Sequence, residues 1–144
     1  MNDAVVNVQA AQTFWDKILE GDLETAFTVL HPDVVLHESS GLPFGGVYHG
    51  LSGVQALATK TVGNFDMEFL SVDVYADRDT AFAHVRQHWT ARTTGIRMTV
   101  PVIEIYKTRD GLISEMDVFY QDTKLVYDTW VEAGLALARE ATAE

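Results

Sequence analysis

The second half of the chain contains four consecutive segments that are rich in Val, Ile, Thr, Phe, Tyr and Trp. Side chains of these types favour β-strands, and the short polar stretches between the segments suit hairpin turns. Strands joined by hairpins form an antiparallel sheet, so this run constrains the fold more than any other feature. The predicted strands span residues 66–76, 79–92, 96–108 and 112–121, separated by turns at 76–79, 93–95 and 109–111.

Helices are predicted before and after this run of strands. Apolar side chains recur at a period near 3.6 in the first segment, which Gly21 ends, and Asp22 can cap a second, short helix. Pro32 cannot continue the second helix, and a first strand follows at about 34–38. The predicted helices span residues 4–20, 23–30, 51–61 and 122–140.

Helices followed by long antiparallel strands indicate an α+β fold. We expect one domain over residues 1–144, with a curved, cone-shaped antiparallel or mixed sheet. The N-terminal helices should pack on the concave face of this sheet, with an additional C-terminal helix. The mouth of such a cone is a natural pocket for a small molecule.

The composition argues against several classes of function. The chain has no Cys, so it offers no disulfide, thiol nucleophile or thiolate metal ligand. Its net charge of −11 argues against binding to nucleic acid or to an anionic membrane, since both attract Lys and Arg. No apolar run approaches the roughly 20 residues of a membrane span, and the N-terminus lacks signal-peptide features. We therefore expect a cytoplasmic protein.

Glu38 is the first candidate site residue. It lies where the short apolar strand from Val34 to Leu36 meets a loop that contains three glycines and Pro43. Carboxylates are seldom fully buried unless they are paired or functional. Glu38 is therefore either a site residue at the end of a strand or a loop carboxylate that stands in water.

Strand 79–92 has two distinct faces, since alternate side chains of a strand point to opposite sides. Polarity alone places the first face in the core and the second in water. The neighbouring strands weaken this interpretation, because their largely apolar faces include Glu104 and Tyr120, a mixture that suits a ligand pocket. The second face could therefore line that pocket instead. The first face carries Ala81, Ala83, Val85, Gln87 and Trp89, and the second carries Phe82, His84, Arg86, His88 and Thr90.

No metal site is predicted among these residues. His84 and His88 are four strand residues apart, about 13 Å, which is too far for one ion to bind both at roughly 2 Å. Arg86 lies between them and could pair with Glu104 on the adjacent strand. Such a pair would be structural, or would hold a charge ready for an anionic intermediate.

Several short motifs, in this order and spacing, resemble the ketosteroid isomerase and SnoaL-like polyketide cyclase branch of the nuclear transport factor 2-like superfamily. The resemblance covers nearly the whole chain, and the loop at residues 41–48 is similar to that of SnoaL-like members. The matching motifs are Leu19-Glu20-Gly21-Asp22-Leu23, Leu30-His31-Pro32-Asp33-Val34, Glu38-Ser39-Ser40-Gly41, Tyr48-His49-Gly50, Thr80-Ala81-Phe82-Ala83-His84 and Asp110-Gly111-Leu112-Ile113.

The resemblance implies roles for individual residues. Glu38 occupies the position of the isomerase base, and Glu104 that of a protonated acid that donates to the oxyanion. Phe14 falls where the isomerases have their oxyanion tyrosine, so the donor would have to come from elsewhere. The candidates are Tyr120, His84, His88 and Arg86. The resemblance also implies that the face with His84 lines the pocket, and that the face with Trp89 lies outside in a homodimer.

These features predict a cofactor-independent enzyme that acts on a hydrophobic carbonyl compound. Glu38 would remove a proton α to the carbonyl, as an isomerase, an aldol-type cyclase or a dehydratase. There are two alternatives, a non-catalytic binding protein of the same fold and an epoxide hydrolase. The epoxide hydrolase would need an Asp–Arg–Asp arrangement, whereas here His84 and His88 flank Arg86. The expected substrate-binding residues are Phe14, Ile18, Met67, Phe69, Met98, Val102, Met116, Val118 and Trp130.

Overall fold

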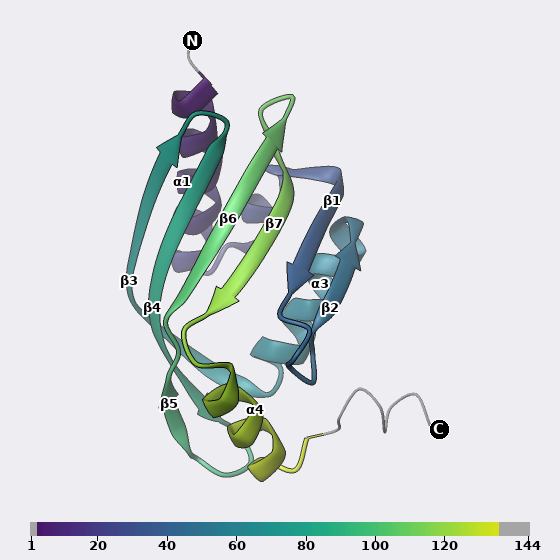
Figure 1. Ribbon diagram of the computed structural model, residues 1–144, viewed down its shortest axis with the longest axis vertical. Coiled ribbons are helices and arrows are strands. Elements are labelled where there is room, and N and C mark those ends of the chain that lie inside the picture. The colour runs from purple at the N-terminus through teal and green to yellow at the C-terminus, as the bar shows by residue number, and fades with distance from the viewer. Residues whose placement is uncertain (1–2, 136–144) are drawn as a thin grey trace.

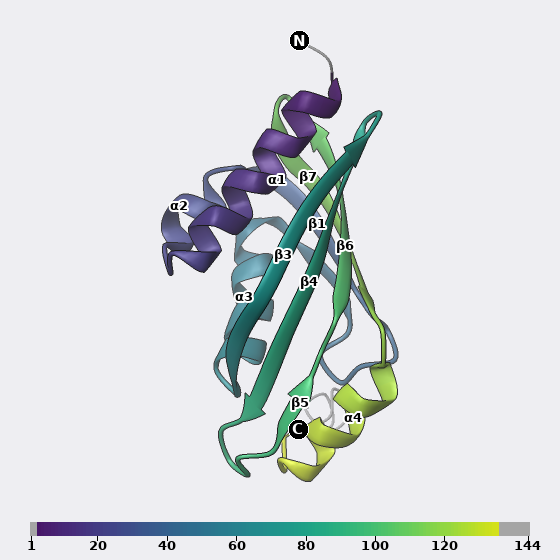
Figure 2. The same ribbon diagram turned by 90° about the vertical axis from the view of Figure 1, so that its left-hand side faces the viewer.

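The computed structural model describes residues 3–135, which form a twisted sheet with helices on one face (Figure 1). Figure 2 shows α1, α2 and α3 together on that face, and α4 at one end of the sheet. The predicted α+β fold is therefore confirmed. The elements are α1 (Asp3–Leu19), α2 (Leu23–Phe27), β1 (Leu30–Glu38), β2 (Gly46–His49), α3 (Gly50–Val62), β3 (Phe65–Asp77), β4 (Thr80–Ala91), β5 (Arg97–Thr99), β6 (Val102–Arg109), β7 (Leu112–Tyr120) and α4 (Thr123–Glu132).

The seven-stranded sheet has the order β2-β1-β7-β6-β4-β3, with β5 paired to β4. β1 is parallel to β7, and the other paired strands are antiparallel. The β6–β7 hairpin turns through Asp110 and Gly111, whose φ angles of 56° and 77° suit a type I′ turn. The parallel pairing brings the end of β1 beside β7, which positions Glu38 next to residues far away in the sequence.

Several boundaries differ from the prediction. Pro101 separates β5 from β6 within the predicted strand 96–108, because proline has no N–H to donate to the ladder. β1 begins at Leu30, earlier than predicted, and β2 lies in a stretch that we expected to be a loop. α4 ends at Glu132, before Gly134 with its φ of 73°. Residues 136–140 of the predicted last helix lie outside the described residues.

The inner face of β4 is the apolar one. α1 packs against β3 and β4, and the small side chains of Ala81 and Ala83 leave room for the helix to approach. The expectation that the opposite face lines the pocket is wrong, because the helices cover the apolar face and leave the polar one outside. The apolar stripe is therefore not available for contact with a second subunit. Its members Ala81, Ala83, Val85, Gln87 and Trp89 are all buried.

An aromatic cluster fills the end of the core near α4. The ring centroids of Phe65 and Trp89 are 5.4 Å apart, and those of Phe44 and Trp130 are 5.1 Å apart. Phe44 comes from the loop that follows Glu38, and Trp130 from α4. The glycine-rich loop thus closes one end of the core, and burial of four large rings supplies much of its apolar surface.

Candidate active site

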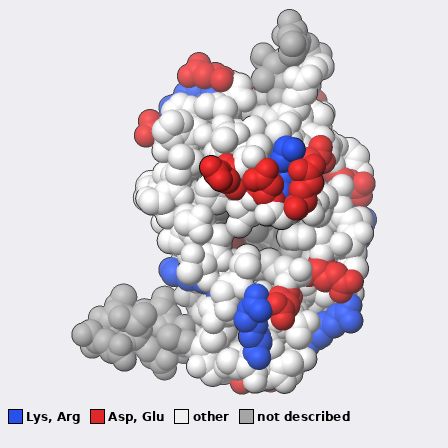
Figure 3. Space-filling model, turned by 180° about the vertical axis from the view of Figure 1, so that it is seen from behind, with Lys and Arg blue, Asp and Glu red and all other residues white. Residues whose placement is uncertain are grey.

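A cavity of about 180 Å³ lies between the inner face of the sheet and helices α1, α2 and α3. It is far larger than the roughly 10–15 Å³ that one water requires, so it suits an organic molecule. Figure 3 views the molecule from the helix side and shows a hollow near the centre of this face, with acidic side chains gathered above it. Among the expected substrate-binding residues, Phe14, Ile18, Met67, Phe69, Val102, Met116 and Val118 line the cavity.

Glu38 lies in this cavity and not in water. Its side chain is at the end of β1, and the residue is only 7% exposed. One carboxyl oxygen accepts the backbone N–H of Ser39 at 3.0 Å, and the other accepts the hydroxyl of Tyr120 at 3.1 Å. Burial raises the pKa of Glu38 to about 8, and the charge of Glu104 adds to this effect, whereas the two hydrogen bonds oppose it.

Glu104 is the second carboxyl group of the cavity. Its Oε1 accepts the hydroxyl of Tyr106 at 2.7 Å. The oxygen of that hydroxyl in turn accepts the indole N–H of Trp15 at 2.7 Å, so the Tyr106 proton is directed to Glu104. Burial raises the pKa of Glu104 to about 7, and the Tyr106 bond partly opposes the rise. Glu104 is thus held by a chain of donors that begins on α1.

The two carboxyl groups flank one residue of β7. In the β1–β7 pairing His37 lies opposite Asp117, so Glu38 is beside Val118, and Val118 pairs with Glu104 on the other side. Their electrostatic coupling follows from this position, because each charge disfavours ionisation of the other. The pKa values of both groups, about 8 for Glu38 and about 7 for Glu104, lie well above the ordinary range of a carboxyl group.

The basic residues predicted for the site lie elsewhere. Arg86 is on the outer face of β4 and contacts Asp73 and Ser71 at 3.2 Å. His88 lies on the same face, within 3.1 Å of the Thr99 hydroxyl. His84 borders a different depression, together with Ile103 and Phe119. Arg86 does not pair with Glu104, because alternate strand residues point to opposite faces and the two side chains are on different faces.

Two residues predicted to bind substrate are also outside the cavity. Met98 and Trp130 are buried, but they are not among the residues that line it. Met98 pairs with Trp89 across β4 and β5, and Trp130 packs against Phe44 and Phe65. Both belong to the closed aromatic end of the core.

The sequence reasoning missed several residues that line the cavity or support it, among them Trp15, Tyr106 and Gln87. Trp15 and Tyr106 form the bond that orients Glu104. Gln87 lines the cavity from β4. A signal was present for Gln87, as a polar residue in an otherwise apolar stripe, and for Tyr106, which is two residues beyond Glu104 on the same face. No local pattern indicates that Trp15 meets Tyr106.

Only one cluster of possible metal ligands occurs in residues 3–135, and it lies away from the cavity. His37, Glu115 and Asp117 bring their ligand atoms within 4.8 Å of one another. They lie on β1 and β7, and the side chain of each is more than one-third exposed. Within the same residues, no helix has the length and apolar character needed to cross a membrane.

Solved structures with the same fold are numerous. An NTF2-like protein from Burkholderia thailandensis has 21% identity and a TM-score of 0.77, covering 90% of this chain and 98% of its own. A protein from Xanthomonas campestris, whose name proposes a polyketide cyclase, has 16% identity and a TM-score of 0.75, covering 88% and 98%. TerC, co-crystallised with polyporic acid, has 18% identity and a TM-score of 0.75, again covering 88% and 98%.

Sequence comparison defines the family. A search of curated proteins found no match. The model of the SnoaL-like domain matches residues 11–116, which include α2, α3 and all strands except the end of β7. Both carboxyl groups of the cavity, Glu38 and Glu104, fall within the matched region. This chain belongs to the SnoaL-like domain family.

Proposed function

We propose that this protein is a cofactor-independent acid–base enzyme that acts on an uncharged, hydrophobic carbonyl compound. The observation that carries the proposal is the pair of carboxyl groups on one largely apolar cavity, the buried Glu38 and the partly buried Glu104. Their pKa values of about 8 and 7 lie near neutral pH, where an efficient general acid or base should titrate. The likeness to a protein named for polyketide cyclisation, and to one crystallised with polyporic acid, supports a small-molecule substrate.

The reaction begins with removal of a proton from the carbon next to the carbonyl. The carboxylate of Glu38 takes this proton, and the electron pair of the C–H bond moves toward the carbonyl oxygen to form an enolate. The protonated carboxyl group of Glu104 donates a hydrogen bond to that oxygen. The enolate can then be reprotonated at another carbon, attack a second carbonyl, or expel a β-hydroxyl group, which are isomerase, cyclase and dehydratase outcomes.

The hydrogen bonds support this division of roles. Glu38 accepts from Ser39 and Tyr120, and such donors favour the ionised form. Glu104 accepts one such bond, from Tyr106. A carbonyl oxygen that accepts from Glu104 favours the protonated form of that residue and leaves the negative charge on Glu38.

The charge around the cavity supports a neutral substrate. No Lys, Arg or His is among the described residues that line it. Asp16, Glu20, Asp22 and Glu24 lie at the junction of α1 and α2, next to the lining residues Ile18 and Leu23. An anionic substrate would meet two acids in the cavity and this acidic segment beside it, and no cation would compensate.

Exchange of α-protons with solvent tests the proposal without knowledge of the reaction subtype. Neutral cyclic ketones, including 1-tetralone, are incubated in D2O and followed by NMR. We expect catalysed exchange, a reduction of about 10²–10⁴-fold in Glu38→Gln and of about 10²–10³-fold in Glu104→Gln. The exposed Glu24→Gln variant is the control and should retain the wild-type rate. Unchanged exchange in Glu38→Gln removes Glu38 as the base.

A binding protein without catalytic activity is the second candidate. Phe14 lines the cavity and has no hydroxyl group that could donate a hydrogen bond to an oxyanion. A protein that only binds its ligand does not need such a donor. Saturable binding of these ketones with no exchange above background favours this candidate. Epoxide hydrolysis with an Arg between two acids has no support, since Arg86 lies on the outer face and contacts Asp73.

A further inference from the structure

The inner face of β4 contains two polar groups with no hydrogen-bond partner among residues 3–135. Gln87 is 5% exposed and lines the cavity, and no described residue forms a hydrogen bond with its side-chain amide. Trp89, two residues along the same face, is 3% exposed and also lines the cavity. Its indole N–H also has no hydrogen-bond partner in the part of the chain that the structure describes. Polar side chains of buried residues normally have partners, so the amide of Gln87, which lines the cavity, requires an explanation.

Other polar groups near the cavity have protein partners. The hydroxyl of Thr61 donates to the carbonyl of Leu57 at 3.2 Å. Tyr120 donates to Glu38, and Tyr106 to Glu104. Gln87 and Trp89 do not bond to each other, although they are neighbours on one face. The Gln87 amide is thus available to a molecule in the cavity, whereas the Trp89 N–H is fully buried and is not.

We infer that Gln87 is a specificity-determining residue that binds a second oxygen of the substrate, remote from the reacting carbonyl. An amide can both donate and accept, so a hydroxyl or a second carbonyl group would satisfy it. The inference rests on the proposed function for the position of the reacting carbonyl. It adds that the substrate is an oxygenated carbonyl compound and not a simple hydrocarbon ketone.

The strand register defines the distance between the two polar contacts. Ala83 pairs with Glu104, and Gln87 is four residues further along β4. Four strand residues span about 13 Å, and the long side chains of Gln87 and Glu104 can each shorten the gap. The second oxygen therefore belongs at the opposite end of the molecule from the carbonyl that faces Glu104. The apolar residues Phe69 and Val102 line the same cavity and would contact the carbon skeleton.

Binding of a matched pair of ketones tests this inference. The probes are 1-tetralone and 6-hydroxy-1-tetralone, which differ by one hydroxyl group at the end opposite the carbonyl. Dissociation constants are measured by calorimetry at pH 6, below the pKa values of about 8 and 7 of Glu38 and Glu104. We expect the hydroxylated ketone to bind about tenfold more tightly to the wild type, as one good hydrogen bond allows.

The Gln87→Met variant has a side chain of similar length without a donor, and should reduce this preference to about one. Met67→Leu alters an apolar lining residue, and should change the affinity for both ketones by the same factor. A tenfold preference that persists in Gln87→Met overturns the inference, and so does failure of both ketones to bind. If the variant does not fold, the assigned amide resonances of Gln87 in the wild type must shift with 6-hydroxy-1-tetralone more than with 1-tetralone; equal shifts also overturn it.

The outcome for Gln87 is separable from the outcome for the proposed function. The affinity ratio is a binding measurement, whereas α-proton exchange measures the chemistry at Glu38. Loss of the ratio in Gln87→Met without any exchange by the wild type would support the binding role of Gln87 in a protein that does not catalyse this step. Exchange without a preference for the hydroxylated ketone would support the enzyme and reject the role of Gln87.

Discussion

Burial of Glu38 and Glu104 links stability to pH. Their folded-state pKa values of about 8 and 7 exceed the ordinary 4.5. Between about pH 4.5 and pH 8 the folded protein therefore holds more protons than the unfolded chain. The free energy of unfolding falls as the pH rises through this range. The stabilisation that comes from the two protonated carboxyl groups is fully present below about pH 4.5 and is lost by about pH 8. We expect Glu38→Gln to be more stable than the wild type at pH 9 by up to a few kcal/mol, and similar to it at pH 5.

Urea denaturation at pH 5, 7 and 9 measures this difference. The control is Glu24→Gln, which removes an exposed acid from α2 and should follow the pH dependence of the wild type. Parallel stability curves for Glu38→Gln and the wild type would contradict a buried, protonated Glu38.

Replacement of Tyr120 tests whether its hydrogen bond stabilises the ionised form of Glu38. Its hydroxyl donates to Glu38 at 3.1 Å and thereby lowers the pKa of that carboxyl. Tyr120→Phe should therefore raise the pKa of Glu38 further, and move the acidic limb of the pH–rate profile for α-proton exchange to higher pH. The buried Val118→Ala variant changes packing beside the same carboxyl without removing a donor, so its profile should keep its position. A Tyr120→Phe profile that coincides with the wild type would show that this bond does not tune the base.

The Trp15–Tyr106 hydrogen bond joins α1 to β6. It is buried, with an N···O distance of 2.7 Å. Tyr106→Phe leaves the indole N–H of Trp15 without an acceptor and Glu104 without its donor, so we expect a loss of about 1–3 kcal/mol of stability. Adding Trp15→Phe removes the unpaired donor, so the double variant should be less destabilised than the sum of the two single variants. Chemical denaturation of all four proteins measures the coupling, and strict additivity would contradict it.

Sequence pattern identified most elements but not which face of β4 lies inside. Alternation separates Ala81 and Trp89 from His84 and Arg86, but it does not say which set the helices cover. Polarity alone gave the right answer, and the inference from the resemblance reversed it. The break between β5 and β6 follows from Pro101, which was visible in the sequence. Glu38 and Glu104 could be predicted as candidates from strand position and resemblance, whereas the Trp15–Tyr106 bond depends on how α1 crosses the sheet.

The outer face of the sheet bears a patch of exposed apolar side chains. Ile103 pairs with both His84 and Phe119, so these residues form one row across β4, β6 and β7. Phe119 is 55% exposed, Ile103 is 37% exposed, and Tyr75 on β3 is 60% exposed. Helices cover the opposite face of the sheet, and in the described residues nothing covers this one (Figure 2). Exposed apolar patches of this kind mark contact surfaces.

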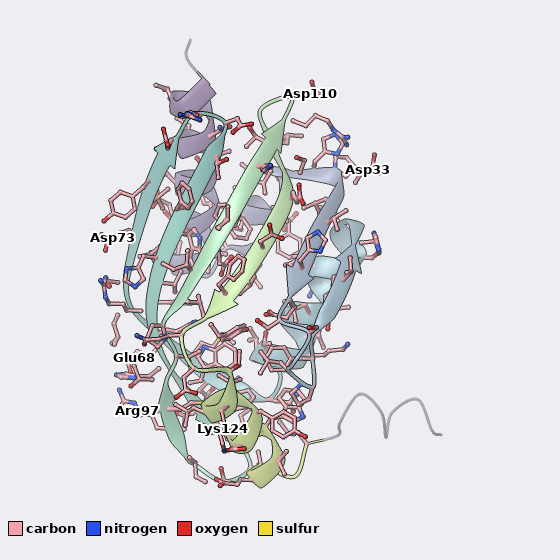
Figure 4. The ribbon with its side chains drawn as sticks, viewed as in Figure 1. Asp33, Glu68, Asp73, Arg97, Asp110 and Lys124 are labelled. Carbon is pink, nitrogen blue, oxygen red and sulfur yellow. The ribbon has the colours of Figure 1, made fainter. Side chains whose placement is uncertain are left out.

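Charged residues surround this patch. Figure 4 shows Asp73 and Glu68 along the β3 edge and Arg97 near β5. Arg86 pairs with Asp73, and Arg97 with Glu68 at 3.1 Å. A surface with apolar residues inside a polar rim has the composition of a protein–protein interface. The homodimer expected from the resemblance would therefore use this outer face, and not the buried stripe that includes Val85 and Trp89.

We propose that two copies associate through the patch defined by Tyr75, Ile103 and Phe119. Phe119→Glu places a charge within the patch, and should convert a dimer into a monomer of 16.0 kDa, because burial of an unpaired carboxylate opposes association. Leu19→Glu is the control, since Leu19 is 51% exposed on the helix side. Light scattering coupled to size-exclusion chromatography distinguishes the two states. A monomeric wild type, or a Phe119→Glu variant that stays dimeric, would exclude this interface. Because Phe119 points away from the cavity, monomeric Phe119→Glu should still bind ketones, which separates assembly from the site.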